Sequence, residues 1–194
     1  PYLDDTCVHS KDLESHFQGL ARVLDAFRKA GLKLQPSKCQ LLREDIEYLG
    51  HIISRDGIRP VPEYLEIVKT WPLPSTKSEA RTFLGKCGYY RRFIKDYSKI
   101  AKPWTDVMGK TDKAAEKEPL QVTPAMTDSF QQLKKALLTA PILAYPRFDS
   151  PEPFILDTDW SQDAATVGAV LSQRQGGQER VICYGAKKLP AAGK

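Results

Sequence analysis

The sequence predicts an α+β fold, with helices dominating the middle of the chain and strands its end. Apolar residues recur at spacings of three and four in segments between 12 and 139, and β-branched and apolar runs fill 154–186. The chain has 194 residues, 41% hydrophobic and 27% charged, which indicates a globular protein and excludes a disordered or fibrous one. No apolar run approaches the roughly 20 residues of a membrane helix, so we expect no membrane partner.

The first part of the chain combines one long helix with short strands. Residues 12–30 predict an amphipathic helix because their leucines and phenylalanines form one stripe, and Gly31 ends it. Residues 38–42 and 46–54 are predicted as short strands, followed by a turn at 55–57.

The middle of the chain is predicted to be helical. A short helix covers about 62–71, since proline suits its first turn. Thr76 and Glu79 form a capping box that opens a longer helix, 76–97, and another helix follows to about Met108.

The last part changes from helix to strand after a boundary. Residues 109–124 are polar and charged and are the best candidate linker. A helix is predicted over 128–139, and a hairpin connection joins the last two strands. The predicted strands are 154–159, 166–172 and 180–186.

The positive charge is concentrated in one window. The whole chain carries +5, but residues 81–110 hold eight basic and two acidic residues and so carry +6, which leaves −1 elsewhere. Such concentration is typical of phosphate contact in nucleic-acid binding. The alternative is a solvated basic helix face, which usually has acids interspersed.

The helix predicted over 76–97 has two distinct faces. One is a core stripe and the other combines small, basic and aromatic residues. The core stripe is Phe83, Cys87, Tyr90 and Ile94, and the second face is Arg81, Gly85, Gly88, Tyr89 and Arg92. Glycine inside a helix costs about 1 kcal/mol relative to alanine, so a compensating contact is expected. Either this face presses into a nucleic-acid groove, or it packs on another helix through small residues.

Two groups of carboxylates are candidates for metal chemistry. Asp4 and Asp5 are adjacent, which is costly unless a cation lies beside them, and Mg²⁺ takes oxygen ligands. An ordinary solvated turn is the alternative. Asp157 and Asp159 alternate on a strand and therefore share a face, although an exposed strand acid would look the same.

Several motifs in one order resemble the reverse transcriptases of gypsy-type LTR retrotransposons. They are Tyr2-Leu3-Asp4-Asp5, Tyr48-Leu49-Gly50-His51, Phe83-Leu84-Gly85, Gly88-Tyr89-Tyr90-Arg91-Arg92 and Leu156-Asp157-Thr158-Asp159. The resemblance covers essentially the whole chain. It implies the C-terminal palm of a polymerase with its metal turn at 1–58, a helical thumb at 59–110, a linker at 111–125, and the first strands of an RNase H-like domain at 126–194.

The resemblance also assigns roles to residues. It implies that Asp4, Asp5 and Asp159 are catalytic carboxylates that bind Mg²⁺ in two-metal sites. It implies contacts with the template–primer, including a primer-grip hairpin, whose alternative is an ordinary hairpin with a glycine at a bulge. The implied nucleic-acid-binding residues are Tyr2, Tyr48, Leu49, Gly50, His51, Arg81, Gly85, Tyr89, Arg91 and Arg92.

The function implied by the resemblance is that of a piece of an RNA-directed DNA polymerase with ribonuclease H. Its partners would be an RNA–DNA template–primer, dNTPs and the rest of the Pol polyprotein. The third polymerase carboxylate of the family lies on an earlier strand, so we expect a fragment that is inactive alone. The alternative is a non-catalytic nucleic-acid-binding remnant or co-opted module. No secretory segment opens the chain, and we expect an intracellular protein in a cytoplasmic particle or the nucleus. Its four cysteines have no metal-site spacing and are expected to be free thiols.

Overall fold

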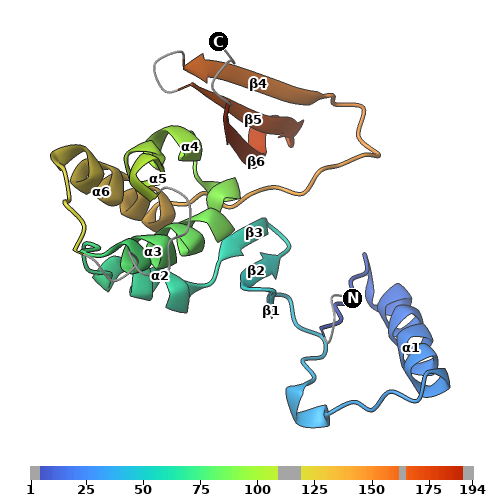
Figure 1. Cartoon of the computed structure of the whole chain (residues 1–194). Coiled ribbons are helices and arrows are strands. Elements are labelled where there is room, and N and C mark those ends of the chain that lie inside the picture. The colour runs from blue at the N-terminus through green and yellow to red at the C-terminus, as the bar shows by residue number, and fades with distance from the viewer. Residues whose placement is uncertain (1–4, 109–118, 162–164, 190–194) are drawn as a thin grey trace. The chain divides into compact units, whose positions relative to one another are not determined.

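The structure is a computed structural model, and it describes residues 5–108, 119–161 and 165–189 (Figure 1). The chain divides into two compact units, 1–55 and 56–194, and each is described by itself. In the described part, no helix is long and apolar enough to cross a membrane.

The first unit contains α1 (Leu13–Lys29), the 3₁₀ turn η1 (Pro36–Lys38), β1 (Ile46–Tyr48) and β2 (His51–Ser54). The predicted helix is confirmed: the Asp12 carboxylate accepts a hydrogen bond from the Ser15 N–H at 2.8 Å and caps α1.

Two strand predictions for this unit need correction. Residues 38–42 form no strand, because Lys38 belongs to the 3₁₀ turn that begins at Pro36 and Leu42 adopts a positive φ of 53°, which interrupts extended backbone. Residues 46–54 are two antiparallel strands, because Leu49 and Gly50 both adopt positive φ (48° and 65°) and reverse the chain between Tyr48 and His51.

The second unit begins with a helical layer. Its elements are β3 (Gly57–Pro60), α2 (Pro62–Thr70), α3 (Lys77–Tyr89), η2 (Arg91–Phe93), α4 (Tyr97–Ile100), α5 (Lys102–Met108) and α6 (Pro124–Leu138). Thr76 caps α3 and Thr123 caps α6. In each case the threonine hydroxyl accepts a hydrogen bond from the backbone N–H three residues later. Helix α6 joins the core formed by the other helices, where the Phe83 and Phe130 rings lie 4.7 Å apart.

The long helix predicted over 76–97 is wrong in its second half. Helix α3 ends at Tyr89, the chain turns through η2, and Asp96 adopts a left-handed φ of 56° before α4. The predicted core stripe is nevertheless buried, with its four residues at most 4% exposed. Ile94 reaches the core from extended backbone after η2, not from the helix.

The chain ends in a three-stranded antiparallel sheet of order β4-β5-β6. Its strands are β4 (Phe154–Ser161), β5 (Thr166–Gln175) and β6 (Gln178–Lys188), longer than predicted. The predicted hairpin is confirmed, since Gly176 and Gly177 both have positive φ and close the turn between β5 and β6. A bulge lies at Leu171 and Ser172.

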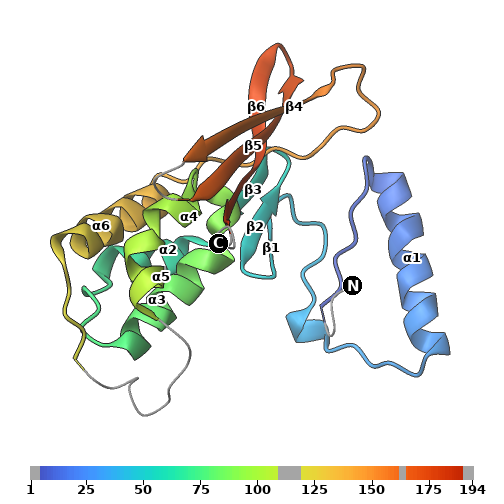
Figure 2. The same ribbon diagram turned by 45° about the horizontal axis from the view of Figure 1, so that its top comes forward.

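One face of this sheet packs against the helical layer of the same unit. Val181 and Tyr184 of β6 pack on the helical core, and the Ala144 N–H donates to the Val181 carbonyl at 2.8 Å. Figure 2 shows β5 and β6 beside α4. The Asp96 side chain lies against Gly168, where an added Cβ would be only 2.6 Å from its Oδ1. Glycine therefore permits α4 to approach the sheet closely.

Candidate nucleic-acid interface and carboxylate sites

Helix α3 presents an open face at Gly85. A Cβ built on Gly85 would meet nothing within 4 Å, so no neighbour in the described chain requires glycine there. Tyr89, one turn further along the same face, is 53% exposed. An exposed glycine in a helix interior next to an exposed aromatic ring leaves the backbone accessible to a partner outside the described chain.

Gly88 has a different explanation, although the sequence placed it on the same face as Gly85. A Cβ at Gly88 would lie 3.4 Å from the Tyr97 hydroxyl, which donates a hydrogen bond to the Leu84 carbonyl at 3.2 Å. Burial raises the pKa of Tyr97 to about 12. Gly88 therefore gives room to an internal tyrosine, which is the packing alternative for this position.

The basic residues of the window differ in their surroundings. The Arg81 guanidinium is half-buried and donates to the Met108 carbonyl at 3.1 Å, at the end of α5. Arg91 and Arg92 lie in η2 and are exposed. The sequence did not indicate that Arg81 supports another helix, because its acceptor lies 27 residues away.

A stack of tyrosines supports Tyr89 from beneath. The Tyr64 and Tyr90 rings stack with centroids 4.4 Å apart, and Tyr89 meets Tyr90 edge-on at 5.0 Å. Burial is the main cause that raises the pKa of Tyr64. Tyr64 and Tyr90 hold the exposed ring in place, and nothing in the sequence singles out Tyr64 beyond its helical spacing.

Asp5 and the hairpin of the first unit border one groove. Tyr2 and Asp4 lie outside the described residues, while Asp5 is exposed. Asp5 lines the same groove as Tyr48 and Leu49.

The hairpin itself is tightly turned. Gly50 occupies its positive-φ position, and His51 Nδ1 lies 2.7 Å from the Leu49 carbonyl. Because a carbonyl only accepts, Nδ1 carries the proton in this contact. The contact fixes the His51 ring relative to the turn.

Asp159 lies on β4 directly opposite Gly168, and its side chain is exposed. It lines a small pocket together with Asp96 and Lys99 of the helical layer. Sequence reasoning missed Asp96, because only the packing of α4 on the sheet brings it near. The described residues contain no group of three or more His, Cys, Asp or Glu side chains that could hold a metal ion, so they do not form a complete metal site by themselves.

The described residues combine Asp5 beside a tight hairpin, a helical layer with an open face at Gly85 and Tyr89, and a following antiparallel sheet. Comparison with known families identifies the class of protein. Residues 1–53 match the family reverse transcriptase (RNA-dependent DNA polymerase), and residues 122–194 match the RNase H-like domain found in reverse transcriptase. The chain thus contains reverse transcriptase and RNase H-like domains, and its relatives are Pol polyproteins of gypsy-type and other LTR transposons.

The relatives are transposon polyproteins. The chain is 37% identical over 193 residues to the retrovirus-related Pol polyprotein from transposon opus and 40% identical over 172 residues to that from transposon 297, both of Drosophila melanogaster. These matches cover 97% and 89% of this chain but only 19% and 15% of the relatives. The chain thus spans less than a fifth of the length of these polyproteins.

Solved structures share the fold. The foamy viral protease-reverse transcriptase in complex with RNA/DNA hybrid matches with a TM-score of 0.73 and 21% identity, over 94% of this chain and 24% of that one. The same protein in complex with dsDNA matches with a TM-score of 0.74 and 22% identity, over 94% of this chain and 36% of that one.

Proposed function

We propose that this chain is part of a retrotransposon enzyme that combines an RNA-directed DNA polymerase with a ribonuclease H. In that enzyme, this part would hold the template–primer duplex between the polymerase site and the ribonuclease H site. The observation that carries the proposal is the open face of α3. Among the described residues, no neighbour of Gly85 forbids a side chain, Tyr89 is exposed and contacts the ring of Tyr90, and Arg91 and Arg92 are exposed. These features suit contact with a sugar–phosphate surface. The glycine leaves the helix backbone accessible, the aromatic ring can stack, and the guanidinium groups can pair with phosphates.

In this proposal the carboxylates that precede and follow the thumb in the sequence serve the chemistry of the intact enzyme. Asp4 and Asp5 would contribute ligands for Mg²⁺ at the polymerase site, near Tyr2, and Asp159 would do so for ribonuclease H. The hairpin of Tyr48, Leu49, Gly50 and His51 would hold the primer end, and dNTPs would be the substrates. We place the protein inside the cell, in a cytoplasmic particle or the nucleus.

The test is binding of the 194-residue chain to an RNA–DNA hybrid at several salt concentrations. We expect log Kd to change linearly with log salt, because phosphate contacts release counterions. Replacing Arg91 and Arg92 together by alanine should weaken binding and reduce the slope by about 2, one for each lost contact. A matched control replaces Lys69 and Arg147, which are exposed on the same unit, and should change the slope little. A salt-independent affinity would contradict the proposal.

A second candidate is a non-catalytic nucleic-acid-binding module. It is favoured by the open face of α3, where Gly85 and Tyr89 are exposed and no carboxylate is needed for binding. Primer extension and hybrid cleavage separate the two. In a longer polyprotein that includes this chain, Asp5→Asn should abolish extension and Asp159→Asn should abolish RNA cleavage, whereas the binding module predicts no such activity to lose. The isolated chain should extend no primer in either case.

A further inference from the structure

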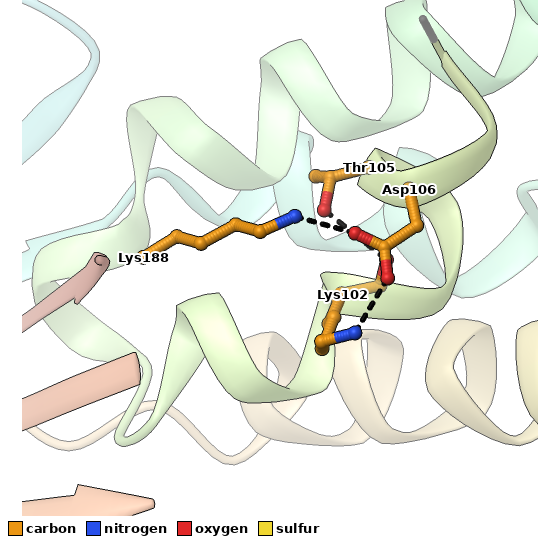
Figure 3. A network of polar contacts seen from close by, with 4 residues as sticks. All are labelled: Lys102, Thr105, Asp106 and Lys188. Atoms are coloured by element: carbon orange, nitrogen blue, oxygen red, sulfur yellow. Dashed lines mark hydrogen bonds and ion pairs between the residues drawn. The ribbon is translucent and has the colours of Figure 1, made fainter. Parts of the chain in front are cut away.

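One carboxylate ties the helical layer to the last strand of the sheet. Asp106 of α5 accepts from Lys102 Nζ through Oδ2 at 2.6 Å and from Lys188 Nζ through Oδ1 at 2.5 Å (Figure 3). Lys102 lies one turn earlier on the same helix, but Lys188 belongs to β6, 82 residues away. The two oxygens of the Asp106 carboxylate therefore bind lysines from two different elements, α5 and β6.

The contact depends on charge more than on packing. The side chains of Lys102, Asp106 and Lys188 are 33%, 37% and 49% exposed, so water and ions reach them. The two lysine contacts hold the pKa of Asp106 below its ordinary value. Partly exposed pairs of this kind weaken as salt screens them.

The ion pair lies at the end of β6, away from the apolar contacts that anchor the strand. Tyr184 packs on the helical core, and Lys188 follows four residues later, about 13 Å along a strand that rises roughly 3.3 Å per residue. The pairing of this end continues to Leu189, whose N–H donates to the Ala165 carbonyl at 2.7 Å. This end of the sheet is therefore docked by a polar contact, beyond the reach of the hydrophobic core.

We propose that Asp106 is an electrostatic latch, which docks the Lys188 end of the sheet on α5 and opens when salt screens the pair. Lys188 lies opposite Thr166, and Thr166 lies opposite Ser161, so the three share one face across the sheet. Ser161 and Thr166 line the pocket that holds Asp159. The latch thereby sets how closely the helical layer approaches the surroundings of Asp159.

The test is hydrogen exchange in the full 194-residue chain, read at the amides of residues 186–189. It is measured at about 0.01 M and about 1 M salt, where the Debye length is roughly 30 Å and 3 Å. Asp106→Asn and Lys188→Met should each speed exchange about two- to fivefold at low salt, the range for a partly exposed ion pair. At high salt, the exchange rate of the parent chain at these amides should approach that of the variants.

Two controls separate the latch from a general charge effect. Lys102→Met leaves the Asp106–Lys188 contact in place and should speed exchange less than Lys188→Met. Glu66→Gln removes a more exposed carboxylate (71% against 37% for Asp106) from an ion pair within α2, the pair with Lys69 at 3.5 Å, and should leave β6 unchanged.

Three results would overturn the latch. They are unchanged exchange in both Asp106→Asn and Lys188→Met, a difference that persists undiminished at high salt, and an effect of Lys102→Met as large as that of Lys188→Met. Because the measurement uses no nucleic acid, its outcome is independent of the proposed polymerase function.

Discussion

Replacing Gly85 by alanine should stabilise the fold and weaken binding to an RNA–DNA hybrid, two effects of opposite sign. Gly85 lies in the interior of α3 and is exposed, and no atom of residues 5–108, 119–161 or 165–189 lies within 4 Å of the position where its Cβ would be. Nothing in the described chain therefore opposes the methyl group. If Gly85 contacts a nucleic acid, the methyl group would instead separate the helix backbone from the sugar–phosphate surface.

The two magnitudes follow from different physics. In an exposed helix interior, alanine is favoured over glycine by about 0.8–1 kcal/mol, so the free energy of unfolding should rise by about that amount. An added methyl group in a close interface costs roughly 1–3 kcal/mol, which weakens Kd by about 5- to 150-fold. Urea unfolding measures the first effect and equilibrium binding to a hybrid measures the second.

Gly88→Ala is the matched control, one turn further along the same helix. Its Cβ would make an ordinary contact near 3.4 Å with the Tyr97 hydroxyl, on the internal side of the helix. We expect hybrid affinity close to that of the parent. Lower stability of Gly85→Ala would show an internal role for Gly85, and unchanged affinity would show that the nucleic acid does not approach it. Either result refutes the reasoning.

Three further predictions concern the fold. Gly57→Ala should lower the free energy of unfolding by about 3–5 kcal/mol in urea, because Gly57 has φ 138° and its Cβ would collide with the Leu143 carbonyl that Ile58 binds; a loss below about 1 kcal/mol would contradict this. In the native chain a maleimide should label exposed Cys39 readily and leave Cys87 unmodified until unfolding, because burial raises the pKa of the Cys87 thiol to about 12; peptide mass mapping checks the order. The folded-state pKa of Asp106 lies below its unfolded value, so its contribution to the free energy of unfolding is present above the unfolded pKa and is lost as pH falls through the folded pKa. Over that pH range, the free energy of unfolding of Asp106→Asn should therefore fall less steeply than that of the parent, as measured by urea unfolding at several acidic pH values.

The sequence predicted the elements whose signals are local. Asp12 and Thr76 mark helix starts that the structure confirms, since a cap needs only residues three positions apart. The paired glycines 176 and 177 likewise specify their hairpin without help from the rest of the chain.

Predictions failed where distant contacts decide the local backbone. Helical periodicity continues from Phe83 to Ile94, yet the chain leaves the helix after Tyr89. The same apolar spacing is satisfied because η2 turns Phe93 and Ile94 into the core, where they are 2% and 1% exposed. Periodicity thus identified which side chains are buried but not the backbone that buries them.

The roles of the basic residues between 81 and 110 were also only partly predictable from the sequence. The sequence counted eight basic residues between 81 and 110 as one phosphate-binding surface. The structure commits Arg81 to the end of α5 and Lys102 to Asp106, so these two charges support the fold. Arg91 and Arg92 remain exposed beside Tyr89. Charge patterning alone did not separate the basic residues bound within the fold from the exposed ones, since the acceptor of Arg81 lies 27 residues away. Substitution of Arg81 should therefore cost stability first, and substitution of Arg91 and Arg92 should cost affinity first.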